Sequence, residues 1–384
     1  MIIPYNRQHI DTSDIKLVNK VLKSNLITQG PNVGKFEKAI AKRVKSKYAV
    51  ASNSATSSLH LACMAIGLKK GDWLWTSPNS FVASSNCGLL CGAKIDFIDI
   101  NPRTYNLDVD RLEKKLVKAK KSKKLPKVVV PVHFAGLPCE MKKIFELSKK
   151  YKFKIIEDAS HALGAKYNSE DIGNCKYSDI AVFSFHPIKM ITTIEGGVAT
   201  TNNQKYADQM SKLRTHGIVK EKFKMKRKKE GNWYYEQNDL GLNYRMNDVQ
   251  AALGLSQLKK LNMFLKKRRE IAKLYIKKFK KLPVNFQLEN LKLKSSYHLF
   301  VIEIQKGKKL KKKIFDILRR NNILVNVHYI PIHLQPYYMK NFGFKKGQFK
   351  LAENYYDRAI SLPIYYSLSN SRVQRIINLI KKYL

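Results

Sequence analysis

"KYAVASNSATSSLHLACMAIGL", residues 47–68, contains two kinds of apolar pattern in immediate succession. The first six residues, KYAVAS, form a short apolar run that predicts a buried strand, whereas SATSSLHLACMAIGL has the apolar spacing of a helix. Small hydroxyl-bearing residues stand at the junction, and Ser and Thr are favoured at helix starts. This stretch therefore predicts a strand that turns directly into a helix.

The same succession of patterns continues around this stretch, from about residue 46 to residue 201. The apolar runs DWLWTS, KIDFIDI and KVVVPVHF each precede a helical pattern, and the runs KFKIIED and DIAVFSF follow. Alternating strand and helix segments of this size predict a mostly parallel sheet between two layers of helices. In such a sheet, ligands bind at the carboxyl ends of the strands.

Beyond residue 201 the pattern changes to longer helices and fewer strands. The run DVQAALGLSQLKKLNMFLKKRREIAKLYIKKFKKL predicts one or two helices that end before Pro283. SYHLFVIEI and ILVNVHYIPI are typical of strands, KKKIFDILRRNN is typical of a helix, and residues 371–384 form the last predicted helix. This half of the chain predicts a smaller α+β domain.

The length of 384 residues suggests two domains rather than one. We expect an α/β fold with a large α/β/α sandwich domain over residues 1–255 and a small domain over residues 256–384. An N-terminal arm of about residues 1–25 is expected to pack with the small domain.

The formal charge of +44 raises the alternative of a polyanion-binding protein. Of the 73 basic residues, 59 are Lys, and they are dispersed over nearly every predicted helix. Arg is the residue that reads bases and phosphates through bidentate bonds. Dispersed lysine therefore favours solvated helix faces and no specific nucleic-acid site, with only salt-sensitive binding to polyanions.

The composition also bears on location and metal binding. No run reaches the roughly 18 apolar residues of a membrane span, and the first residues lack the basic and apolar regions of a signal peptide. No two cysteines form a CxxC pair, so we interpret them as reduced thiols of a cytoplasmic protein and expect no metal site. The cysteines are Cys63, Cys87, Cys91, Cys139 and Cys175.

Lys189 is isolated in a run that is otherwise nearly neutral. In FSFHPIKMITTIEGG, residues 183–197, it is the only formal charge between Asp179 and Glu195. A lysine kept from water in apolar surroundings has a lowered pKa and a reactive neutral amine. The alternative is a lysine that packs its aliphatic stem and extends its ammonium group to solvent.

Three features at predicted strand ends, taken together, suit one cofactor. The hydroxyl-rich helix start after KYAVAS can hold a phosphate through free N–H groups, Asp158 ends the run KIIED, and Lys189 follows DIAVFSF. In this order a phosphate site, an acid and a sheltered amine fit pyridoxal 5′-phosphate. The lysine forms the imine, and the acid keeps the pyridine nitrogen protonated.

Several motifs resemble those of the DegT/DnrJ/EryC1/StrS family of sugar aminotransferases, which are pyridoxal-phosphate enzymes of fold type I. The resemblance runs from residue 2 to the end of the chain. The motifs are IPYNRQHI, LITQGPNVGKFE, SNSATSSLHLA, IEDASHALGA, FSFHPIK, EGG and GLNYRMNDVQAALG. The resemblance implies that Lys189 is the Schiff-base residue and Asp158 the partner of the pyridine nitrogen. It also implies that Phe81 stacks on the ring and that His161 lies close to it.

The resemblance further implies how the cofactor phosphate is held. Ala55, Thr56 and Ser184 would bind the phosphate within one subunit. Asn243, in GLNYRMND, would reach the phosphate of the partner subunit, so the family pattern implies a homodimer with shared active sites.

The C-terminal motifs VNVHYIPIHLQPYY, GNWYYEQNDLGLNYRMND and LPIYYSLS resemble a narrower group within this family. Members of that group aminate UDP-2-acetamido-2,6-dideoxy-β-L-arabino-hexos-4-ulose on the way to pseudaminic acid, with glutamate as amino donor. The residues that this resemblance assigns to the sugar-nucleotide site are Tyr5, Leu26, Ile27, Thr28, Gln29, His328, Tyr329, Ile330 and Pro331.

Other functions stay open at this stage. Another 4-keto nucleotide sugar, such as a UDP- or dTDP-4-keto-6-deoxy-D-hexose, is one alternative substrate. Relatives with histidine at the lysine position act as dehydratases, but this chain has Lys189. A regulatory or polyanion-binding homologue on the same fold is the remaining alternative.

Overall fold

The computed structural model describes residues 2–220, 225, 227 and 231–384. Within these residues the largest sheet has seven strands, in the order β1-β9-β8-β5-β4-β2-β3. Strand β9 runs antiparallel to both of its neighbours, and the other neighbouring pairs are parallel. The predicted α/β fold with a mostly parallel sheet is thus confirmed. The strands are β1 (Tyr48–Ser52), β2 (Trp73–Thr76), β3 (Lys94–Phe97), β4 (Val128–Val130), β5 (Lys154–Asp158), β8 (Ile180–Ser184) and β9 (Gly197–Thr201).

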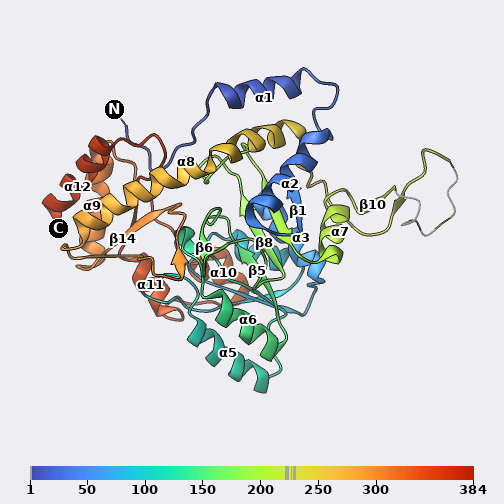
Figure 1. Ribbon diagram of the computed structural model, residues 1–384. Coiled ribbons are helices and arrows are strands. Elements are labelled where there is room, and N and C mark those ends of the chain that lie inside the picture. The colour runs from blue at the N-terminus through green and yellow to red at the C-terminus, as the bar shows by residue number, and fades with distance from the viewer. Residues whose placement is uncertain (1, 221–224, 226, 228–230) are drawn as a thin grey trace.

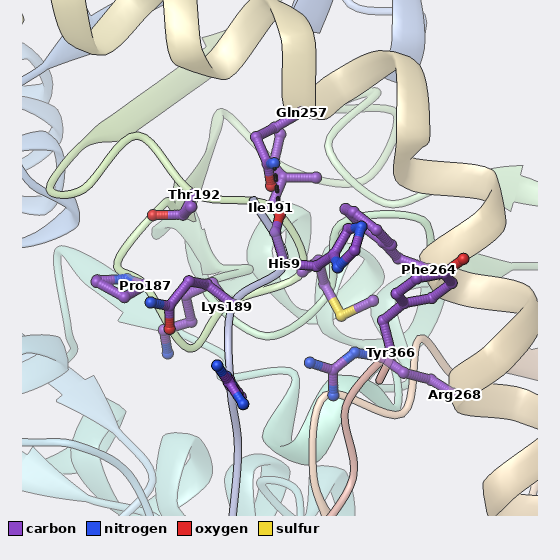
Figure 2. Close-up of a pocket in the computed structure, with 12 residues that line it drawn as sticks. His9, Pro187, Lys189, Ile191, Thr192, Gln257, Phe264, Arg268 and Tyr366 are labelled. Atoms are coloured by element: carbon purple, nitrogen blue, oxygen red, sulfur yellow. Dashed lines mark hydrogen bonds between the residues drawn. The ribbon is translucent and has the colours of Figure 1, made fainter. Parts of the chain in front are cut away.

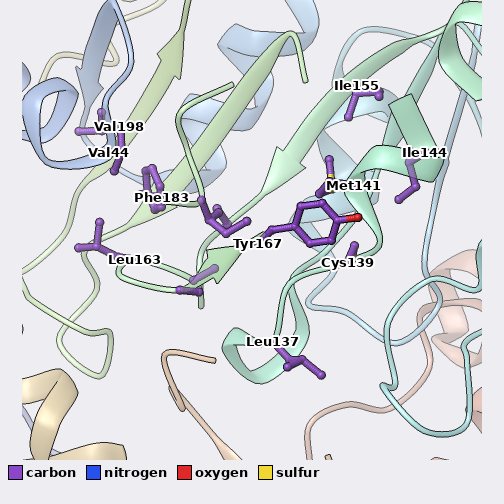
Figure 3. Close-up of a cluster of buried hydrophobic side chains, with 14 of the residues drawn as sticks. Val44, Leu137, Cys139, Met141, Ile144, Ile155, Leu163, Tyr167, Phe183 and Val198 are labelled. Atoms are coloured by element: carbon purple, nitrogen blue, oxygen red, sulfur yellow. The ribbon is translucent and has the colours of Figure 1, made fainter. Parts of the chain in front are cut away.

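Helices cover both faces of this sheet (Figure 1). Successive residues of a strand point to opposite faces, so Val129 packs into one layer and Val128 into the other. Figure 3 shows the apolar side chains that fill the space between the sheet and the first layer. The first layer contains α2 (Pro31–Val44), α5 (Val109–Lys121) and α6 (Met141–Tyr151), and the second contains α3 (Ala55–Ile66), α4 (Ala83–Leu90) and α7 (Gln204–Leu213).

Helix α3 has clear start and stop signals in the sequence. The Ser54 side chain caps its first turn by accepting a hydrogen bond from the Ser57 N–H. Gly67 ends the helix in the left-handed region at φ 78°, a conformation that glycine adopts without steric cost. The strand-to-helix turn predicted from residues 47–68 is therefore confirmed.

Helix α8 (Asp248–Phe279) is one continuous helix that joins two cores. Leu261 and Phe264 pack in the core of the large sheet, whereas Ile271 and Tyr275 pack in a second core. The boundary expected between residues 255 and 256 falls inside this helix. The division into two domains stays a prediction, since α8 belongs to both cores.

The second core surrounds a smaller antiparallel sheet. In the described chain, β14 (Phe300–Ile304) lies between β12 (Val284–Phe286) and β15 (Ala359–Leu362). The helices α9 (Lys308–Arg320) and α12 (Asn370–Tyr383) pack against it. The remaining elements are α1 (Thr12–Leu22), η1 (Phe134–Gly136), β6 (Lys166–Tyr167), β7 (Glu170–Asp171), β10 (Ile218–Val219), β11 (Glu236–Gln237), β13 (Leu293–Lys294), η3 (Ile332–Leu334), α10 (Pro336–Phe342) and α11 (Lys350–Tyr356).

The strand predicted from ILVNVHYIPI, residues 323–332, is wrong. This segment forms two isolated bridges, Ile3 with Ile323 and Asn326 with Ser361, instead of a continuous ladder. Its polar groups bond to separate parts of the molecule, and Pro331 has no N–H to donate to a sheet. The segment is therefore an extended connection that lies between the two cores.

The N-terminal arm begins at the second core, where Ile3 is buried. The Ile3 N–H donates to the Asn322 carbonyl, and the Leu324 N–H donates back to the Ile3 carbonyl. Helix α1 then packs along α8, where Lys260 bonds Asp14 at 2.7 Å. Figure 1 shows α1 and α8 side by side at one edge of the molecule.

Candidate active site

A cavity of about 520 Å³ opens at the carboxyl ends of β5 and β8, next to the start of α3. This is the edge at which an α/β sheet binds its ligands. Most of the residues that the sequence assigned to the cofactor meet here. The assigned residues that line the cavity are Tyr5, Ala55, Thr56, Phe81, Asp158, His161, Ser184, Lys189, His328 and Tyr329.

The start of α3 forms one end of the cavity. Ala55 and Thr56 are its first residues, and no acceptor for their N–H groups lies within the described residues. Ser184, the last residue of β8, lines the same cavity. Free N–H groups at a helix N-terminus bind a phosphate dianion well, because the helix dipole adds to the hydrogen bonds.

Asp158 is buried at the end of β5 and is held by two hydrogen bonds. The Ser84 hydroxyl donates to its Oδ2 at 2.6 Å, and the Ser160 N–H donates to its Oδ1 at 3.1 Å. Ser84 is in turn 2.7 Å from the Ser80 hydroxyl. Ser84 was not assigned from the sequence, although Ser80 and Ser84 lie on either side of Phe81 and are four residues apart.

Lys189 lies on the loop between β8 and β9. Its backbone N–H donates to the His186 carbonyl, which folds the loop back toward the cavity. Burial lowers the pKa of Lys189 to about 8, while the Asp158 carboxylate acts in the opposite direction. This environment keeps part of the Lys189 amine neutral near pH 7, in line with the sheltered lysine predicted from the sequence.

The N-terminal arm closes the space behind Lys189. Figure 2 shows Lys189 on its loop and His9 of the arm, with Gln257 of α8 bonded to the arm. Gln257 donates to the His9 carbonyl at 2.8 Å. A void of only about 10 Å³ remains between these groups, so the amine of Lys189 has room on the side of the large cavity.

Aromatic rings line the wall beside Asp158. The Phe81 side chain is 59% exposed, and its ring centroid is 6.3 Å from that of Tyr329. Burial lowers the pKa of His161 well below its ordinary value, and the nearby Lys189 and His328 lower it further. His161 is therefore a neutral ring in this site.

His328 and Tyr5 form the side of the cavity that belongs to the smaller part of the molecule. The Nδ1 atom of His328 is 2.8 Å from the Ser361 hydroxyl, and its ring lies 5.7 Å from that of Tyr5. Burial lowers the pKa of His328 to about 3, with a further contribution from Lys189.

Other assigned residues lie outside this cavity. Asn243 is exposed and lies beside Asn53, whose side-chain amide donates to its carbonyl at 3.4 Å. Leu26, Ile27, Thr28 and Gln29 form an exposed segment between α1 and α2. Ile330 and Pro331 follow Tyr329 but do not line the cavity. Their roles stay predictions.

The cavity also contains polar residues that the sequence analysis did not assign. His186 and Glu195 face each other across the lysine loop, with Nε2 and Oε1 3.8 Å apart. Both lie inside the quoted stretch around Lys189, so their proximity in the sequence was the available signal. The further polar lining residues are Ser54, Ser80, Ser160 and Asn326.

These features fit pyridoxal 5′-phosphate as a set. The two free N–H groups of α3 suit its phosphate, the hydrogen-bonded Asp158 carboxylate suits a pyridinium nitrogen, and the face of Phe81 suits an aromatic ring. In the described residues no group of three or more His, Cys, Asp and Glu side chains is placed to hold a metal ion. No helix of this part of the chain is long and apolar enough to cross a membrane.

Comparison with known proteins gives consistent matches over the whole chain. The model of the DegT/DnrJ/EryC1/StrS aminotransferase family matches residues 8–381. The chain is 40% identical over 371 residues to the UDP-4-amino-4,6-dideoxy-N-acetyl-beta-L-altrosamine transaminase of Campylobacter jejuni. The aligned region covers 96% of this chain and 94% of that protein.

Solved structures also match this chain over its whole length. One of them is PseC of Helicobacter pylori, an aminotransferase involved in the biosynthesis of pseudoaminic acid, with a TM-score of 0.90 and 34% sequence identity. The match covers 100% of this chain and 99% of the PseC chain. The PLP-form of Streptococcus pneumoniae Spr1654, described as a sugar aminotransferase, has a TM-score of 0.90 and 27% identity over 100% of both chains.

Proposed function

This chain belongs to the DegT/DnrJ/EryC1/StrS aminotransferase family, and on that premise we propose that it moves an amino group from glutamate to C4 of a UDP-linked 4-keto-6-deoxy-hexose. The substrate that we infer is UDP-2-acetamido-2,6-dideoxy-β-L-arabino-hexos-4-ulose, in pseudaminic acid biosynthesis. The function named for the Campylobacter jejuni relative supports this choice. The observation that carries it is the meeting of Lys189, Asp158 and the start of α3 in one cavity.

We infer that the cofactor is pyridoxal 5′-phosphate. When bound, it supplies a carbonyl group that accepts an amine and a ring that takes up electrons. The N–H groups of Ala55 and Thr56 would bind the phosphate together with Ser184. Phe81 would contact the ring, and Asp158 would hold a proton on the ring nitrogen.

Lys189 has the properties of the proton carrier. A pKa of about 8 leaves roughly a tenth of the amine neutral at pH 7, against less than about one part in a thousand for an exposed lysine with a pKa near 10.4. In the first half-reaction its Nζ accepts the proton from Cα of glutamate. In the second half-reaction it delivers a proton to C4 of the sugar.

The cavity also positions the substrates and excludes water. The arm closes the rear of Lys189, so the amino donor and the sugar must enter from the open side of the cavity. Tyr5, His328 and Tyr329 line the wall that would contact the sugar. His328 is neutral because its pKa is near 3, so it would act through hydrogen bonds and not as a cation.

Mass spectrometry of the products from a panel of 4-keto nucleotide sugars tests the proposal. With glutamate present, we expect the amino sugar from the UDP-linked L-arabino substrate in preference to UDP- or dTDP-linked D-hexoses. The Lys189→Ala protein is the control and should give no amino sugar. Preferred amination of another sugar would replace the substrate, and absence of amination from every sugar would contradict the proposed function.

A further inference from the structure

Three rings from separate parts of the chain meet at one wall of the active-site cavity: His161, Tyr329 and His298. The ring centroids of His161 and His298 are 4.4 Å apart, and the rings of His161 and Tyr329 are inclined by only 18°. His161 and Tyr329 line the cavity. His298 lies behind His161 and is 1% exposed.

The hydrogen bonds of His161 define which of its ring nitrogens carries the hydrogen. The Ala135 N–H donates to Nδ1 at 3.3 Å, so Nδ1 is an acceptor. A neutral imidazole has one N–H group, which must then be on Nε2. The Nε2 atom is 3.2 Å from the Tyr329 hydroxyl oxygen, and we conclude that His161 donates to Tyr329.

The Tyr329 hydroxyl keeps its own hydrogen free as a result. It accepts from His161, and no acceptor for its hydrogen is found among the described residues. Burial raises the pKa of Tyr329 strongly, and Asp158 and Tyr5 raise it further, so the hydroxyl stays protonated. The Tyr329 N–H donates to Asn79 Oδ1 at 3.3 Å, which anchors the backbone. The cavity thus contains a fixed O–H group that is available to a ligand.

We propose that Tyr329 is the hydrogen-bond donor for the carbonyl oxygen at C4 of the keto sugar and that His161 positions its hydroxyl for this contact. This inference rests on the proposed function. As an amine adds to C4, the carbonyl oxygen gains negative charge, and a fixed O–H group stabilises that charge in a site with little water. Tyr329 keeps its proton throughout.

The two half-reactions differ in when an oxygen stands on the reacting carbon. The Cα atom of glutamate gains an oxygen only at the end, when water is added to give 2-oxoglutarate, so the earlier loss of the Cα hydrogen involves no carbonyl oxygen for Tyr329 to bind. Tyr329 is therefore expected to act on the sugar carbonyl and not on the loss of the Cα hydrogen. The competing role, a bond from Tyr329 to a carboxylate of glutamate, would affect the other half-reaction.

The test is Tyr329→Phe, which removes the hydroxyl and keeps the ring that packs against Phe81 and Phe134. The two half-reactions are measured separately in single turnovers, one by loss of deuterium from Cα-deuterated glutamate and one by formation of the amino sugar. We expect formation of the amino sugar to slow by about 10²-fold and the loss of deuterium from glutamate to stay within about twofold. Tyr337→Phe is the matched control, since Tyr337 on α10 is 58% exposed and outside the cavity.

The possible outcomes separate a failure of the Tyr329 role from a failure of the proposed function. Equal rates for wild type and Tyr329→Phe, or equal slowing of deuterium loss and of amino-sugar formation, would overturn the role of Tyr329 while the function stands. Slowing of deuterium loss from glutamate alone would assign Tyr329 to the amino donor. A wild-type protein that aminates no keto sugar would overturn the function, and this inference with it.

A second measurement tests the geometry without any turnover. Nitrogen-15 NMR of the histidines in protein freed of cofactor reports which ring nitrogen of His161 carries hydrogen. We expect the Nε2–H form for His161 in both wild type and Tyr329→Phe, because the Ala135 N–H holds Nδ1 as acceptor in each. An Nδ1–H form would reverse the direction of the bond to Tyr329 and refute the proposal.

Discussion

Lys189 shows how a single residue can be recognised from its neighbours in the sequence. Its isolation between Asp179 and Glu195 predicted a sheltered amine, and its environment in the fold lowers its pKa to about 8. Burial is the larger influence, and Asp158 opposes it. A carboxylate favours the charged form of a nearby amine, so these two residues together set the fraction of neutral lysine.

This balance predicts the pH dependence of Lys189 in protein freed of cofactor. Modification by an amine-selective acylating reagent should become half-maximal near pH 8, well below the value of about 10.4 for an exposed lysine. In the Asp158→Asn variant the opposing carboxylate is gone, so the pKa of Lys189 should fall further and the curve should move to lower pH. Peptide mass spectrometry measures the modified fraction at each pH, with the exposed lysines of the same sample as reference. A curve for Lys189 that coincides with theirs would disprove the lowered pKa.

Ser84 is a site residue whose role cannot be predicted from its neighbours in the sequence. Its hydroxyl donates to Asp158 at 2.6 Å, although 74 positions separate the two residues in the chain. An isolated serine in a helix pattern gives no sign of such a partner. The hydrogen bond exists because α4 and the end of β5 meet at the same edge of the sheet.

At the scale of elements, one arginine of α8 connects three segments near the active site. The Arg268 guanidinium donates to the carbonyls of Ile364 at 2.8 Å and His298 at 3.1 Å, and to Asn6 Oδ1 at 3.1 Å. Burial lowers the pKa of Arg268 to about 10, so it stays charged at neutral pH. Arg268 thereby connects the arm, the segment before β14 and the segment after β15.

Arg268→Lys should weaken this junction while keeping the charge. A lysine ammonium cannot reach the several acceptors that the planar guanidinium serves, so buried carbonyls would lose their partners. Each unsatisfied group costs about 1–3 kcal/mol, and we expect a loss of roughly 3 kcal/mol in the free energy of unfolding. Urea unfolding followed by circular dichroism measures it.

The matched control for this prediction is Arg375→Lys, because Arg375 makes an exposed bond to the Asn321 carbonyl. Exposed substitutions of this kind change stability by about 0.5 kcal/mol or less. Equal unfolding midpoints for the Arg268 and Arg375 variants would show that the junction does not depend on the guanidinium.

At the scale of the whole molecule, the active site of one chain is open on the side that carries exposed apolar residues. Phe81 is 59% exposed and Ile194 is 57% exposed, and both border the cavity or its lysine loop. Leu26 and Ile27 are exposed on the segment before α2. Exposed apolar side chains near a ligand site are typical of a surface that a partner covers, which supports the proposal of a homodimer with shared sites.

A mixing experiment tests whether Asn243 acts on the partner. Lys189→Ala and Asn243→Asp proteins, each first assayed alone to establish that it is inactive, are dissociated and reassociated together. If Asn243 acts across the interface, each mixed dimer has one site with both defects and one intact site. Random assortment in a twofold dimer then restores about a quarter of the wild-type activity. Differently tagged chains verify the exchange, and no gain despite exchange would refute the shared site.

The sequence by itself predicted the alternation of strands and helices from about residue 46 to residue 201, the sheet edge at which the cavity opens, and the presence of Lys189 and Asp158 at that edge. The reason is that apolar periodicity and turn residues act over short distances, and parallel strands bring their carboxyl ends to one edge. The start of α3 was predictable for the same reason, because its capping residue and its free N–H groups are local features.

Only the tertiary structure decided the contacts that join distant segments. The Ser84 bond to Asp158 depends on how α4 packs beside the end of β5. The three bonds of Arg268 and the meeting of His161 with Tyr329 and His298 depend on how segments far apart in the chain pack together. The prediction of a strand at residues 323–332 was wrong because it, too, depended on contacts between distant segments. Its apolar residues favour extended backbone, but whether an extended segment pairs with a sheet depends on neighbours far away in the chain.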